Sequence, residues 1–156
     1  MPKVESEEDS IADSTQESMH YYYKGLELFE EKKFDEAVRA LNQFVTLTPR
    51  HVYADRAQFL VAESAYLSKE YGLAIVASNL LEARYPYSVR LPEAMHRRIL
   101  SLIELKQVEP AKLVLEKMMK RYPTSPLLSE ASKAMAHLDD DANKKTVKKD
   151  PPPLLD

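Results

Sequence analysis

The five residues RYPYS, from Arg84 to Ser88, return as RYPTS from Arg121 to Ser125, and LTPRH from Leu47 to His51 is a weaker copy of both. One interval of 37 residues separates the prolines of the three copies, which are Pro49, Pro86 and Pro123. A period held across three copies is typical of proteins built from stacked repeats. The sequence therefore predicts three structural units of the same kind.

Each copy has the apolar spacing of two helices. In YYYKGLELFEEKK (21–33), Tyr22, Leu26 and Phe29 fall on one helical face, and FDEAVRALNQFVTLTP (34–49) carries a second apolar stripe that ends at its proline. Each copy is therefore predicted to be a helical hairpin. We expect the three turns near Lys32–Lys33, Lys69–Glu70 and Lys106–Gln107.

Composition supports an all-α domain. The chain has 156 residues, two glycines and no cysteine, with a formal net charge of −3. Scarce glycine disfavours sheets built on tight hairpins, and the charge gives no general attraction to nucleic acid. Since no apolar run approaches the roughly 20 residues that cross a bilayer, we expect no direct membrane insertion.

Small residues and prolines at fixed positions of each copy resemble the tetratricopeptide repeat (TPR). They are Gly25, Ala37 and Pro49 in the first copy, Ala62, Ala74 and Pro86 in the second, and Ala111 and Pro123 in the third. In the third copy, Ile99 stands at the position of Gly25 and Ala62, where a small residue is usual. The resemblance implies an all-α, right-handed superhelical stack of three TPR-like hairpins followed by a C-terminal capping helix.

The expected domain spans residues 17–138. Its repeats are placed at about 18–51, 55–88 and 92–125, and the capping helix at 126–138. Residues 1–16 and 139–156 lack apolar periodicity and are predicted to be disordered tails. The second tail ends in DPPPLLD (150–156), which is either an untethered end or a docking motif.

The period of 37 exceeds the usual TPR length of about 34, and the surplus follows the proline, in YPYSVRLPEA and YPTSPLLSEA. This feature is similar to the repeats of bacterial envelope proteins of the BamD and YbgF (CpoB) type. That resemblance implies a periplasmic or outer-membrane-associated adaptor whose signal or lipoprotein sequence is not in this chain.

Two alternatives stay open. One is a cytoplasmic TPR adaptor or cochaperone; members that grip a chaperone's C-terminal carboxylate use Lys and Asn one turn apart, whereas Lys24 is followed at that spacing by Leu28. The other is a self-assembling subunit, which would associate through the apolar edge at the N-terminal end of the stack, close to the tyrosines at 21–23.

The TPR resemblance implies that the first helix of each hairpin lines a concave groove that binds a peptide or helix of a partner protein. The expected groove residues are Met19, Tyr22, Leu26, Phe29, Arg56, Phe59, Glu63, Tyr66, Glu93, His96, Leu100 and Ile103. Several of these side chains would alternatively pack between helices.

The sequence contains no recognisable catalytic motif. The four histidines, at 20, 51, 96 and 137, are dispersed, and there is no glycine-rich phosphate loop or zinc-type histidine spacing. The run His96–Arg97–Arg98 could hold an anion, although basic helix residues usually face solvent. We expect a non-enzymatic protein without metal or cofactor.

Overall fold

The computed structural model describes residues 7–147, with the side chains of 15–141 and 144. All the regular structure in this range is helical, as predicted. The helices are α1 (Glu7–Glu30), α2 (Phe34–Leu47), α3 (Ala54–Leu67), α4 (Tyr71–Arg84), α5 (Leu91–Glu104), α6 (Val108–Arg121) and α7 (Leu127–Val147).

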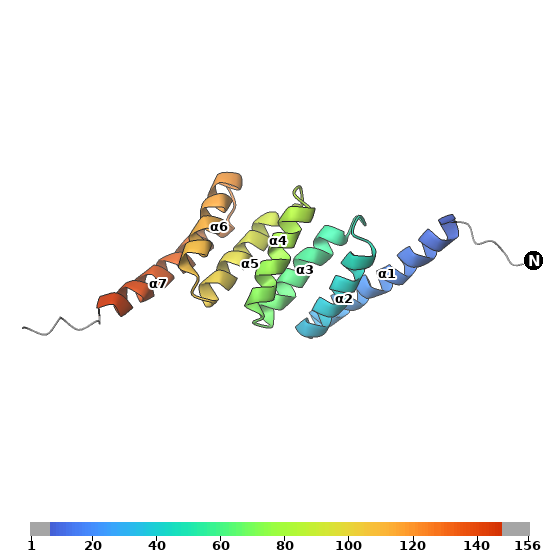
Figure 1. The fold of residues 1–156 in the computed structure, drawn as a ribbon, viewed down its shortest axis with the longest axis horizontal. Helices are drawn as coiled ribbons and strands as arrows, with labels where there is room; N and C mark the ends of the chain where they lie inside the picture. Colours follow the sequence, from blue (N-terminus) through green and yellow to red (C-terminus); the bar gives the residue numbers. More distant parts are fainter. Residues whose placement is uncertain (1–6, 148–156) are drawn as a thin grey trace, which may run out of the picture.

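The helices form a stack of three hairpins, α1–α2, α3–α4 and α5–α6, closed by α7 (Figure 1). Each helix packs on the next along the chain, α3 also contacts α5, and α7 lies against both α5 and α6. The core is correspondingly divided into clusters that follow one another along the stack. This nearest-neighbour packing is typical of repeat proteins.

The hairpin turns fall where the sequence predicts them. Lys32, Lys69 and Lys106 have positive φ angles of 60°, 65° and 57°. After Lys32, the Lys33 N–H donates to the Leu28 carbonyl at 2.8 Å, and the other two turns repeat this bond. A left-handed residue followed by such a bond is a Schellman motif, which satisfies carbonyls at a helix end.

Small residues are buried where paired helices cross. Ala37, Ala62, Ala74 and Ala111 are all 0% exposed. At Gly25 a Cβ atom would lie 2.5 Å from Cγ of the buried Leu41, whereas at Gly72 it would meet nothing within 4 Å. The first hairpin therefore has no room for a side chain at position 25.

We expect opposite effects from alanine at the two glycines. Gly25→Ala should lower the free energy of unfolding by roughly 1 kcal/mol, because overpacking against Leu41 outweighs the gain in helix propensity. Gly72→Ala should raise it by about 0.5–1 kcal/mol, because only the propensity changes. Urea denaturation measures both, and equal stabilisation would show that Leu41 yields to the new methyl group.

The repeated Tyr-Pro segments join consecutive repeats. The Tyr85 hydroxyl donates to the Pro49 carbonyl at 2.8 Å, and Arg121 Nη2 donates to the Pro86 carbonyl at 2.6 Å. Ser88 Oγ donates to Asp55 Oδ2 at 2.7 Å and accepts the Arg90 N–H at 3.2 Å. The repeated motif thus fixes each repeat on the one before it.

The ends of the domain differ from the predicted boundaries. α1 starts at Glu7 and α7 continues to Val147, so residues 7–16 and 139–147 are helical in the structure rather than part of disordered tails. Neither helix contains proline, which would interrupt the backbone hydrogen bonds. The rest of the predicted tails, including DPPPLLD, lies outside the described residues.

The predicted capping helix corresponds to α7, which begins at Leu127. It buries Ala131 and Met135 in the cluster that it shares with α5 and α6. Ser129, Lys133 and His137 are exposed, as expected for the outer face of a terminal helix.

Candidate partner-binding site

A groove of about 370 Å³ lies between the first helices of the hairpins and α7, and we call it the inner groove. Its lining residues come from α1, α3, α5 and α7, and they are Phe29, Phe59, Leu60, Glu63, Glu93, His96, Arg97 and Leu127. The helices that the sequence assigns to the concave side therefore meet around one cavity. Four of these side chains are aromatic or aliphatic, namely Phe29, Phe59, Leu60 and Leu127.

An ion pair between Glu63 of α3 and Arg97 of α5 lines the inner groove. Arg97 Nη2 donates to Glu63 Oε1 at 2.7 Å, and Arg97 Nε bonds to Glu63 Oε2. Cζ of the same guanidinium lies 4.8 Å from the centre of the Tyr66 ring. Burial alone would lower the pKa of Arg97, but the hydrogen bonds and charge of Glu63 outweigh burial and raise it. Arg97 is therefore a fixed cation already occupied by its partner.

His96 brings a buried polar atom to the inner groove. The residue is only 4% exposed, and its Nε2 has no hydrogen-bond partner among the described residues. Glu130 Oε1, from α7, is 3.7 Å away. Burial lowers the pKa of His96, while Glu130 opposes this effect. A neutral imidazole at neutral pH has one unused hydrogen bond at Nε2, although this atom is itself covered in the free chain.

The charges around the inner groove are largely paired. Arg90 contacts Glu93 at 3.4 Å and lies over the Phe59 ring, with Cζ 5.8 Å from its centre. Arg97 is held by Glu63. An incoming carboxylate would therefore meet arginines that already have anionic partners, and an apolar segment would meet Phe29, Phe59 and Leu127.

Apart from Tyr22, the predicted groove residues divide into three groups. Phe29, Phe59, Glu63, Glu93 and His96 line the cavity. Met19, Leu26, Tyr66 and Ile103 are partly buried and pack against the core clusters. Arg56 is exposed and Leu100 is half-buried.

The prediction that Tyr22 lines the groove is wrong, because Tyr22 is a core residue. It is 2% exposed, and its ring lies 5.0 Å from that of Phe44 and 5.1 Å, stacked, from that of Tyr53. Tyr22 and Phe29 point in nearly the same direction from α1, so their shared face does not show that Tyr22 is covered by Phe44 and Tyr53 while Phe29 lines the groove.

Three lining residues were missed from the sequence, namely Leu60, Arg97 and Leu127. Leu60 and Arg97 are each one helical turn from a chosen residue, Glu63 and Glu93, so the same stripe indicates them. Leu127 is absent from the predicted list because the sequence predicts α7 as a capping helix. However, α7 follows the third hairpin in the position of a fourth first helix, and the TPR resemblance implies that first helices line the concave side.

Within residues 7–147, no helix combines the length and apolar character needed to cross a bilayer. In the same range, no three His, Asp or Glu side chains come together in a group that could hold a metal ion.

Comparison with known proteins supports the repeat type. A family model described as tetratricopeptide repeat matches residues 93–125, which include α5 and α6. No curated protein sequence matches the chain. A solved structure titled "First TPR of Spaghetti (RPAP3) bound to HSP90 peptide SRMEEVD" aligns with a TM-score of 0.65 and 20% identity, over 83% of this chain and 95% of that one.

The narrower likeness to BamD and YbgF repeats has no counterpart among these matches and stays a prediction. The TM-score and the matched third repeat agree with the hairpin stack seen in Figure 1. The fold of this chain is that of a tetratricopeptide-repeat protein.

Proposed function

We propose that the chain is a non-enzymatic adaptor that binds a peptide or helix of a partner protein in the inner groove. The observation that carries the proposal is the cavity between α1, α3, α5 and α7, with apolar walls and with His96, whose Nε2 has no hydrogen-bond partner among the described residues. Concave apolar sites with a few placed polar atoms are typical of ligand sites. The similar solved structure, which holds a peptide, supports the same mode of use.

The partner segment that fits best is apolar, with neutral or basic rather than acidic flanks. Glu63, Glu93 and Glu130 are close to the cavity, and Arg97 and Arg90 are already paired with two of them. The peptide in the similar structure, SRMEEVD, ends in an acidic run. Like charges facing each other across an interface disfavour binding, so this groove should reject such a peptide.

Tyr66→Ala tests the groove without removing a core residue. We expect the thermal midpoint to change by only a few degrees, since Tyr66 is half-buried, and partner capture to fall about fivefold, since Arg97 loses the ring beneath it. Capture is measured in cells by photo-crosslinking from position 93, which lines the groove. Position 109, on an exposed side chain of α6, is the matched control.

Three results would contradict this assignment. Unfolding of Tyr66→Ala would make Tyr66 a core residue. Equal capture from positions 93 and 109 would remove the groove as the binding surface. Saturable binding of a labelled SRMEEVD peptide below about 100 μM would contradict the expected partner chemistry.

For the setting, we propose the bacterial cell envelope, where the chain would be periplasmic or associated with the outer membrane. The support is the sequence resemblance of the extended Tyr-Pro-x-Ser segments. The alternative is a cytoplasmic adaptor or cochaperone. Fractionation of cells that express the tagged, full gene product distinguishes them, since recovery with cytoplasmic markers would reject the envelope.

Self-association is the remaining alternative for the function. Tyr23 is 61% exposed in α1, at the N-terminal end of the stack, so an aromatic surface is available there. Sedimentation at two protein concentrations tests it. A monomer mass at both concentrations favours the adaptor.

A further inference from the structure

A second groove lies on the other side of α5, between α4 and α6, and we call it the outer groove. Its volume is about 700 Å³. On α5, Glu93, His96 and Arg97 face the inner groove, whereas Arg98 and Leu102 line the outer one. Residues 98 and 102 are one turn apart and share a face of α5. This face points roughly opposite to the face that carries residues 93, 96 and 97. The two grooves are therefore separate surfaces.

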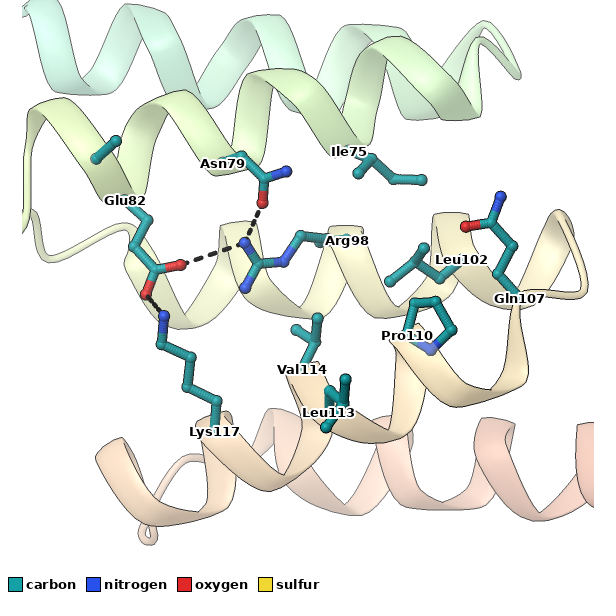
Figure 2. A pocket seen from close by; sticks show the side chains of 11 residues that line it. Ile75, Asn79, Glu82, Arg98, Leu102, Gln107, Pro110, Leu113, Val114 and Lys117 are labelled. Carbon is teal, nitrogen blue, oxygen red and sulfur yellow. Dashed lines mark hydrogen bonds and ion pairs between the residues drawn. The ribbon is translucent and has the colours of Figure 1, made fainter.

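The outer groove has a polar end and an apolar end (Figure 2). Asn79, Glu82, Arg98 and Lys117 gather at the polar end. The apolar part is formed by Ile75, Leu102, Pro110, Leu113 and Val114. Leu113 is 66% exposed, so a large aliphatic side chain faces this groove without cover.

Arg98 supplies an unsatisfied buried donor. It is 6% exposed; its Nη1 bonds to Asn79 Oδ1 and lies 3.2 Å from Glu82 Oε2. Its Nε is buried without a hydrogen-bond partner among the described residues. A buried donor of this kind favours the arrival of an acceptor.

Positive charge exceeds negative charge at the polar end. Glu82 Oε1 lies 2.6 Å from Lys117 Nζ and 3.1 Å from Arg121 Nη1, and Glu82 Oε2 lies 3.2 Å from Arg98 Nη1. Three cations thus share one carboxylate. The Lys117 side chain is 53% exposed, so it can turn toward a second anion without unfolding the helix.

We propose that the outer groove binds a segment of a partner protein in which an acidic residue is followed by aliphatic residues. The carboxylate lies against Lys117 and Arg98, and the aliphatic side chains lie on Ile75, Pro110 and Leu113. The site is independent of the inner groove, whose arginines are paired one to one with carboxylates.

The test compares two peptides, acetyl-Asp-Leu-Leu-amide and acetyl-Asn-Leu-Leu-amide, by amide NMR titration of the full chain. We expect shifts at residues of α4, α5 and α6 that line the outer groove, with little change in α1. The Asp peptide should bind about fivefold more tightly, because only its side chain carries a negative charge that pairs with Lys117 and Arg98. Shifts centred on the inner groove, or equal affinities, would overturn the proposal.

Variants separate the groove from general electrostatics. Lys117→Glu should abolish the preference for the Asp peptide, while Lys120→Glu, at an exposed cation of α6 that does not line the groove, should retain it. Leu113→Ser should weaken both peptides alike. Equal losses in the two lysine variants would show non-specific attraction and reject the site.

Two other occupants of the outer groove, the chain's own C-terminal segment and a second copy of the chain, would each give a result that rejects the proposal. If a chain ending at Val147 shifts the α4 and α6 resonances without peptide, the occupant is the chain's own C-terminal segment, which also combines aspartate with leucine. If those resonances move with protein concentration alone, a second copy occupies the groove.

Discussion

Replacing Glu82 with alanine lowers the free energy of unfolding by about 3 kcal/mol. The change leaves Arg98, which is 6% exposed, with a hydrogen bond to Asn79 and no counter-charge among the described residues. Lys117 and Arg121 lose the same carboxylate, so three cations then repel one another. The thermal midpoint should fall by roughly 6–12 °C.

Glu116→Ala is the matched control for this prediction, because Glu116 is an exposed glutamate on α6. Its free energy of unfolding should change by less than about 0.5 kcal/mol. Chemical denaturation of both variants gives the comparison. Equal, small effects would mean that water reaches Arg98 and compensates for the missing carboxylate.

The contribution of Glu82 should also depend on pH. Burial alone would raise its pKa, but the hydrogen bond from Lys117 and the charge of Arg98 outweigh burial and lower it below the ordinary value of 4.5. A carboxyl group with a lowered pKa stabilises the fold above its ordinary pKa and loses this effect as pH falls through the lowered one. The stability difference between wild type and Glu82→Gln should therefore shrink below about pH 4.5.

Ala74→Leu should cost about 1–3 kcal/mol and open the middle of the stack. Ala74 is 0% exposed and belongs to the cluster that α1–α4 share, so the larger side chain has no space without movement of a helix. Ala83→Leu, at an exposed position of the same helix, is the control and should be close to neutral. Urea denaturation measures both.

A loss below about 0.5 kcal/mol for Ala74→Leu would show that the crossing between α3 and α4 adapts to volume. In that case the recurring alanine would reflect helix propensity rather than close packing. Ala37→Leu, at the equivalent position of the first hairpin and also 0% exposed, distinguishes a property of one site from a property of the repeat.

The hairpin stack could be predicted from the sequence because the evidence was local and repeated. Apolar spacing defines helices, and the period of 37 residues puts Pro49, Pro86 and Pro123 at the same point of each unit. The start of α1 and the end of α7 could not be predicted in this way. Residues 7–16 and 139–147 have helix-compatible composition without an apolar stripe, and apolar periodicity does not detect such segments.

The inner groove was predicted in outline, and the errors have a common physical origin. The sequence shows which residues share a helical face, but each first helix contacts its own partner helix, its neighbour and the cavity. Tyr22 turns to α2, whereas Phe29 reaches the groove seven residues later, or about two turns on. The buried position of Arg98 had one signal, since it lies among Met95, Ile99 and Leu102 on an apolar stripe.

The bonds from Tyr85 to the Pro49 carbonyl and from Arg121 to the Pro86 carbonyl have an evolutionary consequence. In both joints the acceptor belongs to the backbone, which any sequence provides, while the donor is a tyrosine in one and an arginine in the other. If a unit of 37 residues were duplicated, a donor on the new copy could bond to the proline carbonyl at the end of the preceding copy. The array can therefore lengthen, and its copies can diverge, without a compensating change in the older neighbour.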